Sequence, residues 1–351
     1  MNKKAFIDEI ENMFPGKVTQ GELLSRHTTI GIGGPAEIFY IAKDEVELKK
    51  VLGLAGKHAV PVWVLGGGSN VIVSDKGLEG LVIKIQLNGF EKVSASEFSI
   101  ANKAKVKSRL SQLSPSSGYN IENLNGKTTQ SGKPIYIKVG AGWRLSALMQ
   151  RCLSEEITGL EWFSGIPSSV GGAVYMNIHG GESFFSDFIV SVTTLALEGE
   201  SKTYTRPEMK FDYDCSIFQQ NKEIVTSVVL RLYKGNVKSA SEVIKKWGVA
   251  KITNQPQKSA GCIFQNLNKT QQQLLKLPTP SIGYIIDTKL HLSGYCVGGA
   301  RISPKHAGFI ENINSASASD VKTLVELVEK RFKDKYGLDL KREVEFIGSF
   351  V

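Results

Sequence analysis

Three glycine-rich loops contain the residues of this chain that are best suited to hold an anionic group. The loop LGGGSN at 65–70 follows an apolar run, and its consecutive glycines permit positive φ angles and a close backbone approach to a ligand. Successive N–H groups in such a loop can form an anion nest for a pyrophosphate. The segment GIPSSVGGA at 165–173 has the composition of a loop that opens a helix toward a phosphate. With TTIGIGGPA at 28–36, the three loops favour a ligand site over simple turns.

Other nucleotide-binding motifs are incomplete, and no metal-binding motif is present in the sequence. The segment GKT at 126–128 resembles the end of a P-loop, but Ile121 stands where that loop requires glycine. The turn GAG at 140–142 is followed by Leu145, where a dinucleotide fingerprint needs a small residue. The four cysteines form no C-x-x-C pair, which argues against a disulfide framework and against a zinc site. We therefore expect no bound metal.

The composition is that of a globular protein. The chain has 351 residues, 41% of them hydrophobic and 22% charged, with a formal net charge of +9. This length suggests two or three domains, and no run approaches the roughly 18 apolar residues of a membrane span. Acidic residues interrupt the N-terminal apolar pattern, so we predict no signal peptide, no membrane partner and a cytoplasmic location. The basic segment 102–138 matches no nucleic-acid module, so we predict no nucleic-acid partner.

Alternating strand and helix patterns predict the units that must position the loops. A first α/β lobe is expected from strands at 37–41, 60–65, 71–73 and 81–85 and a helix at 44–58. After a basic, polar insertion at about 93–133, a second unit begins with a strand at 135–139 and a helix at 145–155 and ends with a strand at 224–233. The last unit has its clearest helix at 319–336, stopped by Gly337. The predicted domains are 1–90, 91–235 and 236–351.

A strand is also predicted at 340–346, near the C-terminus. Leu340, Val344 and Phe346 share one face by period two. The opposite face carries Lys341, Glu343 and Glu345. These charges are compatible with a solvated strand face, and Glu345 serves as the internal comparison for any special role of Glu343.

Six segments occur in the order found in one known family. They are HTTIGIGGPAEIF (27–39), PVWVLGGGSNVIVSDKGLEGLVI (61–83), GLEWFSGIPSSVGGAVYMN (159–177), SAGCIFQN (259–266), GGARISPKHAGFIEN (298–312) and REVEFIG (342–348). As a set they resemble the UDP-N-acetylenolpyruvoylglucosamine reductase family in its shorter type, over most of the chain outside 93–133. The resemblance implies an α+β fold, with a two-lobed FAD-binding domain of the vanillyl-alcohol-oxidase or PCMH type and a C-terminal α+β substrate-binding domain.

The resemblance also implies a reaction and its cofactors. Members of this family use NADPH to reduce FAD, which then reduces UDP-N-acetylglucosamine enolpyruvate to UDP-N-acetylmuramate for peptidoglycan and cell-wall synthesis. The implied partner is a small UDP-sugar, and we expect a monomer. The implied cofactor contacts come from the three loops, at Thr29, Gly33, Gly66, Gly67, Gly68, Ser69, Asn70, Gly165, Ile166, Pro167, Ser168, Ser169, Gly171 and Gly172.

The implied catalytic residues lie in the second and third units. Cys262 matches the family's serine proton donor, and a thiol can donate a proton provided that it remains protonated. Glu343 matches the family's carboxylate near the enolpyruvyl group, where it acts as an acid or orients the enolate. Tyr213 is implied to lie near the substrate, and Asn266 and His306 are implied to bind it.

The chain departs from the family pattern in the segment FDYDCSIF at 211–218. Asp214 stands where the family has arginine, and a carboxylate beside an accumulating negative charge would oppose the reaction. We hypothesise that His179 or Arg301 supplies the missing positive charge near the substrate. Ser168, where glycine is commoner, is a smaller departure that affects flavin contacts.

Two other functions remain open at this stage. Asp214 favours a flavin oxidase or dehydrogenase of the same superfamily that acts on another substrate. The third hypothesis is a catalytically silent protein that binds flavin or a UDP-sugar and regulates wall synthesis.

Overall fold

The computed structural model describes residues 2–97, 133–181 and 183–350. The insertion predicted at about 93–133 therefore lies almost entirely outside the described residues. Within the described part of the chain, no helix is long and apolar enough to cross a membrane.

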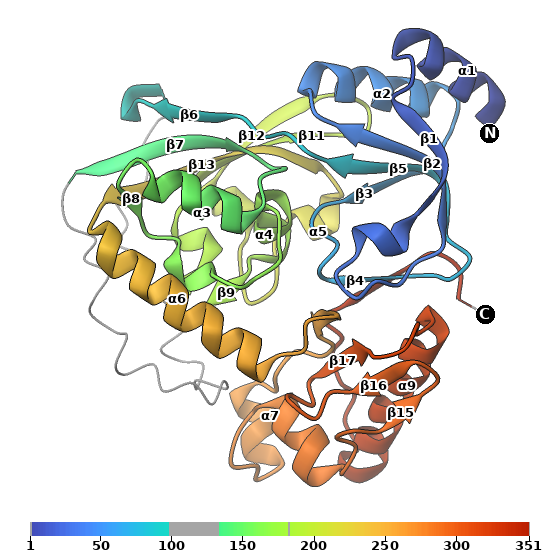
Figure 1. The fold of residues 1–351 in the computed structure, drawn as a ribbon, viewed down its shortest axis with the longest axis vertical. Coiled ribbons are helices and arrows are strands. Elements are labelled where there is room, and N and C mark those ends of the chain that lie inside the picture. Colours follow the sequence, from blue (N-terminus) through green and yellow to red (C-terminus); the bar gives the residue numbers. More distant parts are fainter. Residues whose placement is uncertain (1, 98–132, 182, 351) are drawn as a thin grey trace.

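The first lobe is a small sheet covered by two helices at one end of the molecule (Figure 1). It contains α1 (Lys3–Met13), β1 (Val18–Leu23), β2 (Pro35–Ala42), α2 (Glu45–Lys57), β3 (Val62–Leu65), β4 (Val71–Val73) and β5 (Leu78–Ile85). The strand order is β1-β2-β5-β3, with β5 parallel to both β2 and β3. Asp44, the first residue of the helix predicted at 44–58, lies just outside α2 and caps it by accepting a hydrogen bond from the Glu47 N–H.

The second lobe is a mostly antiparallel sheet with short helices. Its elements are β6 (Phe90–Val93), β7 (Pro134–Gly140), α3 (Leu145–Leu153), β8 (Ile157–Thr158), α4 (Val170–Met176), β9 (His179–Gly180), β10 (Ser183–Phe184), β11 (Ile189–Leu195), β12 (Ser201–Thr205), α5 (Phe218–Asn221) and β13 (Ile224–Lys234). The main strand order is β12-β11-β13-β7-β6. One continuous hydrophobic core joins this lobe to the first, which holds the loops at their facing edges in fixed positions.

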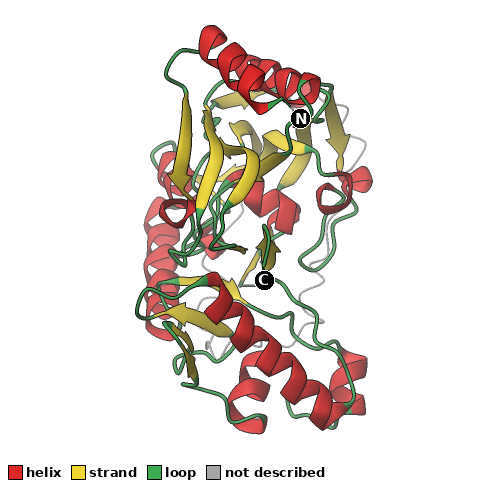
Figure 2. Cartoon of the chain, turned by 90° about the vertical axis from the view of Figure 1, so that its right-hand side faces the viewer, coloured by secondary structure: helices red, strands yellow, loops and turns green. Residues whose placement is uncertain are grey.

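The C-terminal part has its own hydrophobic core. Its elements are α6 (Val237–Asn254), β14 (Ser259–Cys262), α7 (Lys269–Leu274), α8 (Ile282–Tyr284), β15 (Cys296–Val297), β16 (Ala300–Ile302), β17 (Phe309–Asn312), α9 (Ala318–Tyr336) and β18 (Glu345–Ile347). The sheet order is β14-β17-β16-β15, and α9 packs beside it (Figure 2). The predicted helix at 319–336 is confirmed, with Gly337 at φ +70° as its stop.

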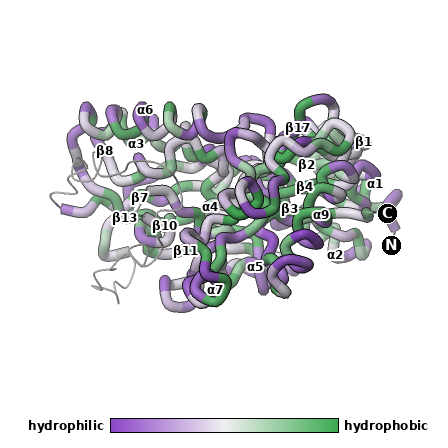
Figure 3. The backbone as a smooth tube through the Cα atoms, turned by 90° about the horizontal axis from the view of Figure 1, so that it is seen from below, coloured by the Kyte–Doolittle hydropathy of each residue, from purple (hydrophilic) through white to green (hydrophobic). Residues whose placement is uncertain are grey.

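Helix α6 runs from the second lobe toward the C-terminal part (Figure 1). Hydrophilic and hydrophobic residues alternate along it (Figure 3), as expected for a helix with one buried face. On that face the Trp247 ring packs edge-to-face against Trp162 of the second lobe, with 5.7 Å between ring centroids. The division of the chain at 90 and 235 stays a prediction.

The strand predicted at 340–346 is wrong in its extent, because the segment changes partner partway along. Residues 341–344 bond to the C-terminal part, where the Glu343 N–H donates to the Ile263 carbonyl over 2.8 Å. From Glu345 onward the chain leaves that partner and forms β18, which pairs in parallel with β4 of the first lobe. A regular strand therefore covers only Glu345–Ile347, and Glu343 lies at the crossing between the two parts.

Candidate active site

A cavity of about 900 Å³ lies where the two lobes and the C-terminal part meet. Its wall includes loop 66–70 from the first lobe and loop 165–172 from the second. Side chains from 213–214, 261–266 and 343–347 complete it. This volume falls in the range of sites for cofactors and other small ligands.

The first two glycine loops face each other across a gap too narrow for side chains. A Cβ added to Gly66 would lie 2.7 Å from the Ser169 Oγ, and one added to Gly67 would lie 2.8 Å from the Pro167 carbonyl oxygen. Gly68 has a φ of +67°, and a Cβ there would meet the His27 carbonyl oxygen at 2.0 Å. We call loops 66–70 and 165–172 together the glycine cradle.

The cradle presents backbone donors to the cavity. Among the described residues, the N–H groups of Gly67, Gly68 and Ser69 have no hydrogen-bond acceptor. Unsatisfied N–H groups beside a cavity are suited to bind an anion such as a pyrophosphate. The cradle thus fits a dinucleotide cofactor that needs a close backbone approach. The Ser168 hydroxyl donates to the Ser169 carbonyl within the loop.

The third glycine loop supports the cradle from behind. The Thr29 N–H donates to the Gly68 carbonyl over 2.9 Å, and its hydroxyl donates to the Ser259 carbonyl over 2.6 Å. Neither Thr29 nor Gly33 lines the main cavity. Gly33 instead lines a smaller cavity of about 400 Å³, where its φ of +142° lets it pack against Val73. The structure does not bring these two residues to the cradle surface.

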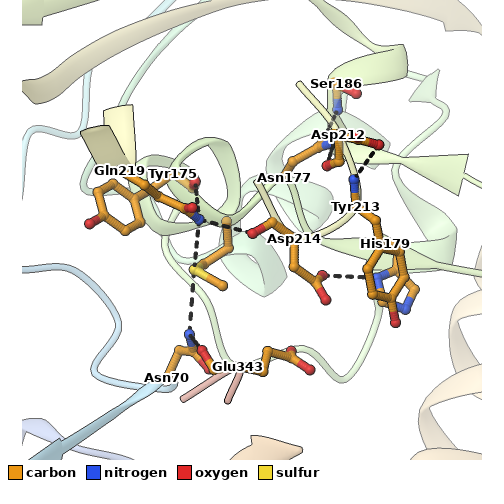
Figure 4. Close-up of polar contacts among 11 residues, drawn as sticks. Asn70, Tyr175, Asn177, His179, Ser186, Asp212, Tyr213, Asp214, Gln219 and Glu343 are labelled. Carbon is orange, nitrogen blue, oxygen red and sulfur yellow. Dashed lines mark hydrogen bonds and ion pairs between the residues drawn. The ribbon is translucent and has the colours of Figure 1, made fainter. Parts of the chain in front are cut away.

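A hydrogen-bond network connects the cradle to the segment that carries Asp214 (Figure 4). The Asn70 amide donates to the Glu343 carbonyl over 3.0 Å and contacts the Met176 sulfur at 3.4 Å. On the other side of Met176, the Gln219 amide donates to the backbone carbonyls of Tyr175 and Asp214, over 3.1 and 3.0 Å. The network fixes the turn on which Asp214 sits.

Asp214 and His179 form a close pair at the cavity wall. The Asp214 side chain is 3% exposed, and its Oδ1 lies 3.4 Å from the His179 Nδ1. The His179 ring also stacks at a tilt on Tyr213, with centroids 5.1 Å apart (Figure 4). Of the two charge carriers hypothesised from the sequence, the structure therefore places His179 beside Asp214.

Arg301 is not brought to the cavity. Its guanidinium makes two contacts with the Glu311 carboxylate, at 2.9 and 2.8 Å, across neighbouring strands β16 and β17. A guanidinium held by a carboxylate in this way has its charge balanced locally. In the described arrangement Arg301 does not offset Asp214.

Tyr213, Asp214, Cys262 and Glu343 gather on one part of the cavity wall, which we call the acidic cluster. Burial raises the pKa of Glu343 well above its usual range, and the neighbouring Asp214 carboxylate raises it further. Burial and the Glu343 and Asp214 carboxylates likewise raise the pKa of the Cys262 thiol. Burial, followed by the Asp214 carboxylate, raises the pKa of Tyr213. Near neutral pH the thiol and the phenol therefore keep their protons.

Asn266 and His306 also line the cavity beside this cluster. The Asn266 amide hydrogen-bonds Tyr213, and its oxygen accepts from the Ile282 N–H over 3.0 Å. Burial lowers the pKa of His306, whose Nδ1 accepts a hydrogen bond from the Gly308 N–H over 3.2 Å. His306 therefore presents a neutral ring.

Two lysines in the wall were missed by sequence analysis. Lys251 on α6 is 8% exposed, and burial lowers its pKa to about 7. Its side chain packs against Gly165, and its ammonium lies 5.5 Å from the centre of the Trp247 ring. Lys222 extends from the end of α5, with its ammonium 3.5 Å from the Tyr175 hydroxyl. In the helix pattern of α6, Lys251 extends the spacing of buried Val243 and Trp247, which is a signal that could have marked it.

Comparison with known proteins matches both halves of the chain. Residues 36–108 and 111–204 match the FAD binding domain family, and residues 253–347 match the C-terminal domain of UDP-N-acetylenolpyruvoylglucosamine reductase. The UDP-N-acetylenolpyruvoylglucosamine reductase of Lachnoclostridium phytofermentans is 33% identical over 98% of both chains. The chain belongs to the UDP-N-acetylenolpyruvoylglucosamine reductase family.

Two further relatives agree with this family assignment. The UDP-N-acetylenolpyruvoylglucosamine reductase of Prochlorococcus marinus is 32% identical over 95% of this chain and 98% of its own. The crystal structure of the Thermus caldophilus reductase superposes with a TM-score of 0.67 at 29% identity, covering 94% of this chain and 98% of that chain. The predicted family is confirmed, and so is the α+β fold with an FAD-binding domain and a C-terminal domain of the reductase type.

Members of this reductase family need FAD, and the glycine cradle fits it by its close approach and free N–H groups. Within the described residues, no group of three His, Cys, Asp or Glu side chains is placed to hold a metal ion.

Proposed function

We infer that this protein reduces UDP-N-acetylglucosamine enolpyruvate to UDP-N-acetylmuramate with FAD, as a step in peptidoglycan synthesis. The observation that carries this inference is the single cavity where an FAD-suited cradle and a set of protonated side chains meet, in a chain that matches the reductases along nearly its whole length. NADPH as the reductant, a cytoplasmic location and a monomeric state remain proposals that follow from the family resemblance.

The glycine cradle holds the cofactor in this proposal. The N–H groups of Gly67, Gly68 and Ser69 bind the FAD pyrophosphate, and loop 165–172 closes the other side. When bound, FAD supplies hydride transfer to the substrate alkene. Thr29 contributes indirectly, because its hydrogen bond to Gly68 fixes the cradle loop.

Cys262 supplies the proton that must reach the other alkene carbon. Its thiol retains that proton at neutral pH because burial disfavours the thiolate and the Asp214 carboxylate adds to this effect. A protonated thiol inside the cavity can donate directly to the carbon, and water then restores the proton. Gly261 gives strand β14 a φ of +84° just before Cys262, which turns the chain at this point.

Tyr213, Asn266, His179 and His306 are the proposed substrate contacts. Tyr213 and Asn266 hydrogen-bond each other and offer donors to the enolpyruvyl group. Lys222 and Lys251 line the same cavity, so cationic side chains are available to an anionic nucleotide sugar. Lys251 can gain a proton when such a group binds, because its pKa of about 7 rises beside an anion.

An anaerobic half-reaction experiment tests this function. The purified protein is reduced with NADPH, UDP-N-acetylglucosamine enolpyruvate is added, and the visible absorption band of the flavin is followed. We expect the oxidised band to return together with UDP-N-acetylmuramate, identified by mass spectrometry. A reduced flavin that persists with the UDP-sugar would contradict the proposal.

The alternative of a flavin oxidase acting on another substrate is favoured by one observation, the buried Asp214 carboxylate at the position of the family arginine. The same experiment separates the two functions. An oxidase would leave the flavin reduced with the UDP-sugar and reoxidise it rapidly when oxygen is admitted.

A further inference from the structure

Asp214 has a buried oxygen with no hydrogen-bond partner among the described residues. Its Oδ1 faces His179, whereas its Oδ2 is fully enclosed by protein and accepts no hydrogen bond. The residue has a φ of +48°, and Gln219 and Ser216 fix the surrounding turn by donating to backbone carbonyls. In Figure 4 the Asp214 carboxylate lies on the side of Glu343, and both residues line the same cavity. An unpaired buried oxygen at that place needs a donor.

Glu343 is held rigidly at the other side of that space. Its N–H donates to the Ile263 carbonyl over 2.8 Å, and its own carbonyl accepts from the Asn70 amide over 3.0 Å. Its side chain lines the cavity together with Asp214. These two hydrogen bonds fix the main chain of Glu343 from two different parts of the fold, and so fix the point from which its side chain enters the cavity.

No neighbouring cation forms an ion pair with the Glu343 carboxyl group among the described residues. The other titratable side chains that line the cavity with it are His179, Tyr213, Asp214, Lys222, Glu223, Lys251, Cys262, His306 and Glu345. Of these, only Asp214 joins burial as a cause of the raised pKa of Glu343. His306 is neutral by burial, and Glu345 accepts a hydrogen bond from Tyr175 over 3.4 Å. The adjacent Arg342 is turned outward, where it makes a bidentate pair with Glu329 at 2.6 and 2.7 Å.

Two enclosed carboxyl groups that face each other cannot both be ionised at low cost, so one of them takes the proton. The groups around each carboxyl decide which of the two carries the proton. The Asp214 carboxylate has the His179 ring 3.4 Å away, whereas the causes that raise the pKa of Glu343 are burial and Asp214, with no cation among them. The negative charge therefore settles on Asp214, and the proton settles on Glu343.

We propose that Asp214 is a positioning residue that keeps Glu343 protonated in the resting enzyme, with the His179 ring beside Asp214 on its other side. Glu343 then donates a hydrogen bond to the substrate carboxylate or to the enolate oxygen that develops from it. An ionised Glu343 would repel both. This inference rests on the proposed function for its substrate, but the state of Glu343 is a property of the protein alone.

The direct test observes the Glu343 carboxyl by NMR in FAD-loaded protein that carries ¹³C at the side-chain carboxyls of glutamate. Glu343→Gln assigns the resonance. In the unmodified protein we expect a protonated Glu343 at pH 7. An ionised Glu343 at pH 7 would overturn the proposal outright, whether or not any variant folds.

The variant Asp214→Asn removes the charge and keeps the shape, and asparagine tolerates the left-handed backbone at this position. We expect its Glu343 to titrate at least about one pH unit lower than in the unmodified protein. Asp212→Asn is the matched control, because Asp212 is exposed and lies two residues earlier on the same turn. An unshifted titration in folded Asp214→Asn, or an equal shift in Asp212→Asn, would contradict the proposal.

Turnover adds a second readout and separates this inference from the function on which it rests. The kcat limb that falls as Glu343 loses its proton should move to lower pH in Asp214→Asn, with little change in KM at low pH. Turnover in which this limb does not move would refute the positioning role and leave the reductase function intact. A shifted NMR titration without any turnover of the UDP-sugar would refute the function alone.

Discussion

The glycine cradle and the acidic cluster share one cavity but are built in different ways. The cradle is made of backbone, and its geometry depends on missing side chains: a Cβ on Gly66 or Gly67 would collide with the facing loop. The acidic cluster is made of side chains, and its chemistry depends on burial and on which charges face one another. Changes in the cradle should therefore act on stability and cofactor binding, and changes in the cluster on proton supply.

The difference also bears on Ser168 and Asp214, the two positions at which the sequence is expected to depart from the family pattern. A cradle formed by backbone tolerates a change such as Ser168, whose hydroxyl bonds within its own loop. In a cluster of side chains, one exchange alters every neighbour through electrostatics, as Asp214 does for Tyr213, Cys262 and Glu343. The predictions below test whether the two regions can be disturbed separately.

The largest expected effect is on proton supply. Cys262→Ala should slow substrate reduction by about 10²- to 10⁴-fold, because the alkene carbon loses its proton donor. FAD binding and thermal stability should stay near those of the unmodified protein, and Cys262→Ser should retain most of the rate. Stopped-flow reoxidation of the flavin by the UDP-sugar measures this, with exposed Cys296→Ser as the control. Full activity of Cys262→Ala would assign the proton to another group.

Gly68→Ala tests the cradle. The new Cβ would sit 2.0 Å from the His27 carbonyl oxygen at a φ of +67°, so we expect a loss of about 2 to 4 kcal/mol in unfolding free energy. FAD should also be lost on gel filtration. Gly53→Ala is the control, since Gly53 lies within α2 with open space around it and should gain about 0.5 to 1 kcal/mol. A stable, FAD-replete Gly68→Ala would show that the cradle is adaptable.

Lys251→Met tests a residue that lies beside the cradle and acts through its charge. Its folded pKa of about 7 lies below the ordinary 10.5, so between these values the unfolded chain holds more protons and stability rises with pH. Without bound FAD, Lys251→Met should flatten the rise of stability with pH. At pH 7 it should stabilise the protein by about 1 to 3 kcal/mol, a net gain that already includes the loss of the contact with Trp247. Denaturant unfolding from pH 6 to 10 measures this, and exposed Lys246→Met should show neither effect.

The smallest effect is expected where the first lobe contacts the C-terminal part. Asp75 accepts hydrogen bonds from the Ala318 and Ser319 N–H groups at the start of α9, at 2.7 and 3.1 Å. Asp75→Asn should cost about 1 kcal/mol, because a carboxylate there also complements the helix dipole. Asp334→Asn, at the exposed far end of α9, should cost nothing in the same urea titration. Equal losses in both variants would indicate a general charge effect.

Much of the fold could be predicted because its signals are local. The capping Asp44 before α2 and Gly337 after α9 mark helix ends within a few residues of sequence. The strand at 340–346 was predicted wrongly because alternation does not reveal that residues 341–344 and 345–347 pair with different parts of the fold. Partner choice depends on tertiary packing, which a short window does not contain.

The candidate site was predictable to a similar extent. The cradle followed from glycine spacing, but only the fold shows that Thr29 braces it and that Gly33 faces another cavity. Arg301 was a reasonable carrier of positive charge until its pairing with Glu311 was seen. Lys251 was missed because a lysine on a helix is normally solvated, although its spacing from Val243 and Trp247 follows the buried face of α6.

The two main-chain hydrogen bonds of Glu343 have a consequence for the order of folding. Its N–H is bound by the C-terminal part and its carbonyl by Asn70 of the first lobe, 273 residues away in sequence. A contact of such long range forms late, after the domains that it joins have folded. The two loops of the glycine cradle belong to the two lobes, so during refolding we expect the quenching of flavin fluorescence to precede the return of turnover. Equal rates for the two signals would mean that this acid is in place as soon as the cofactor binds.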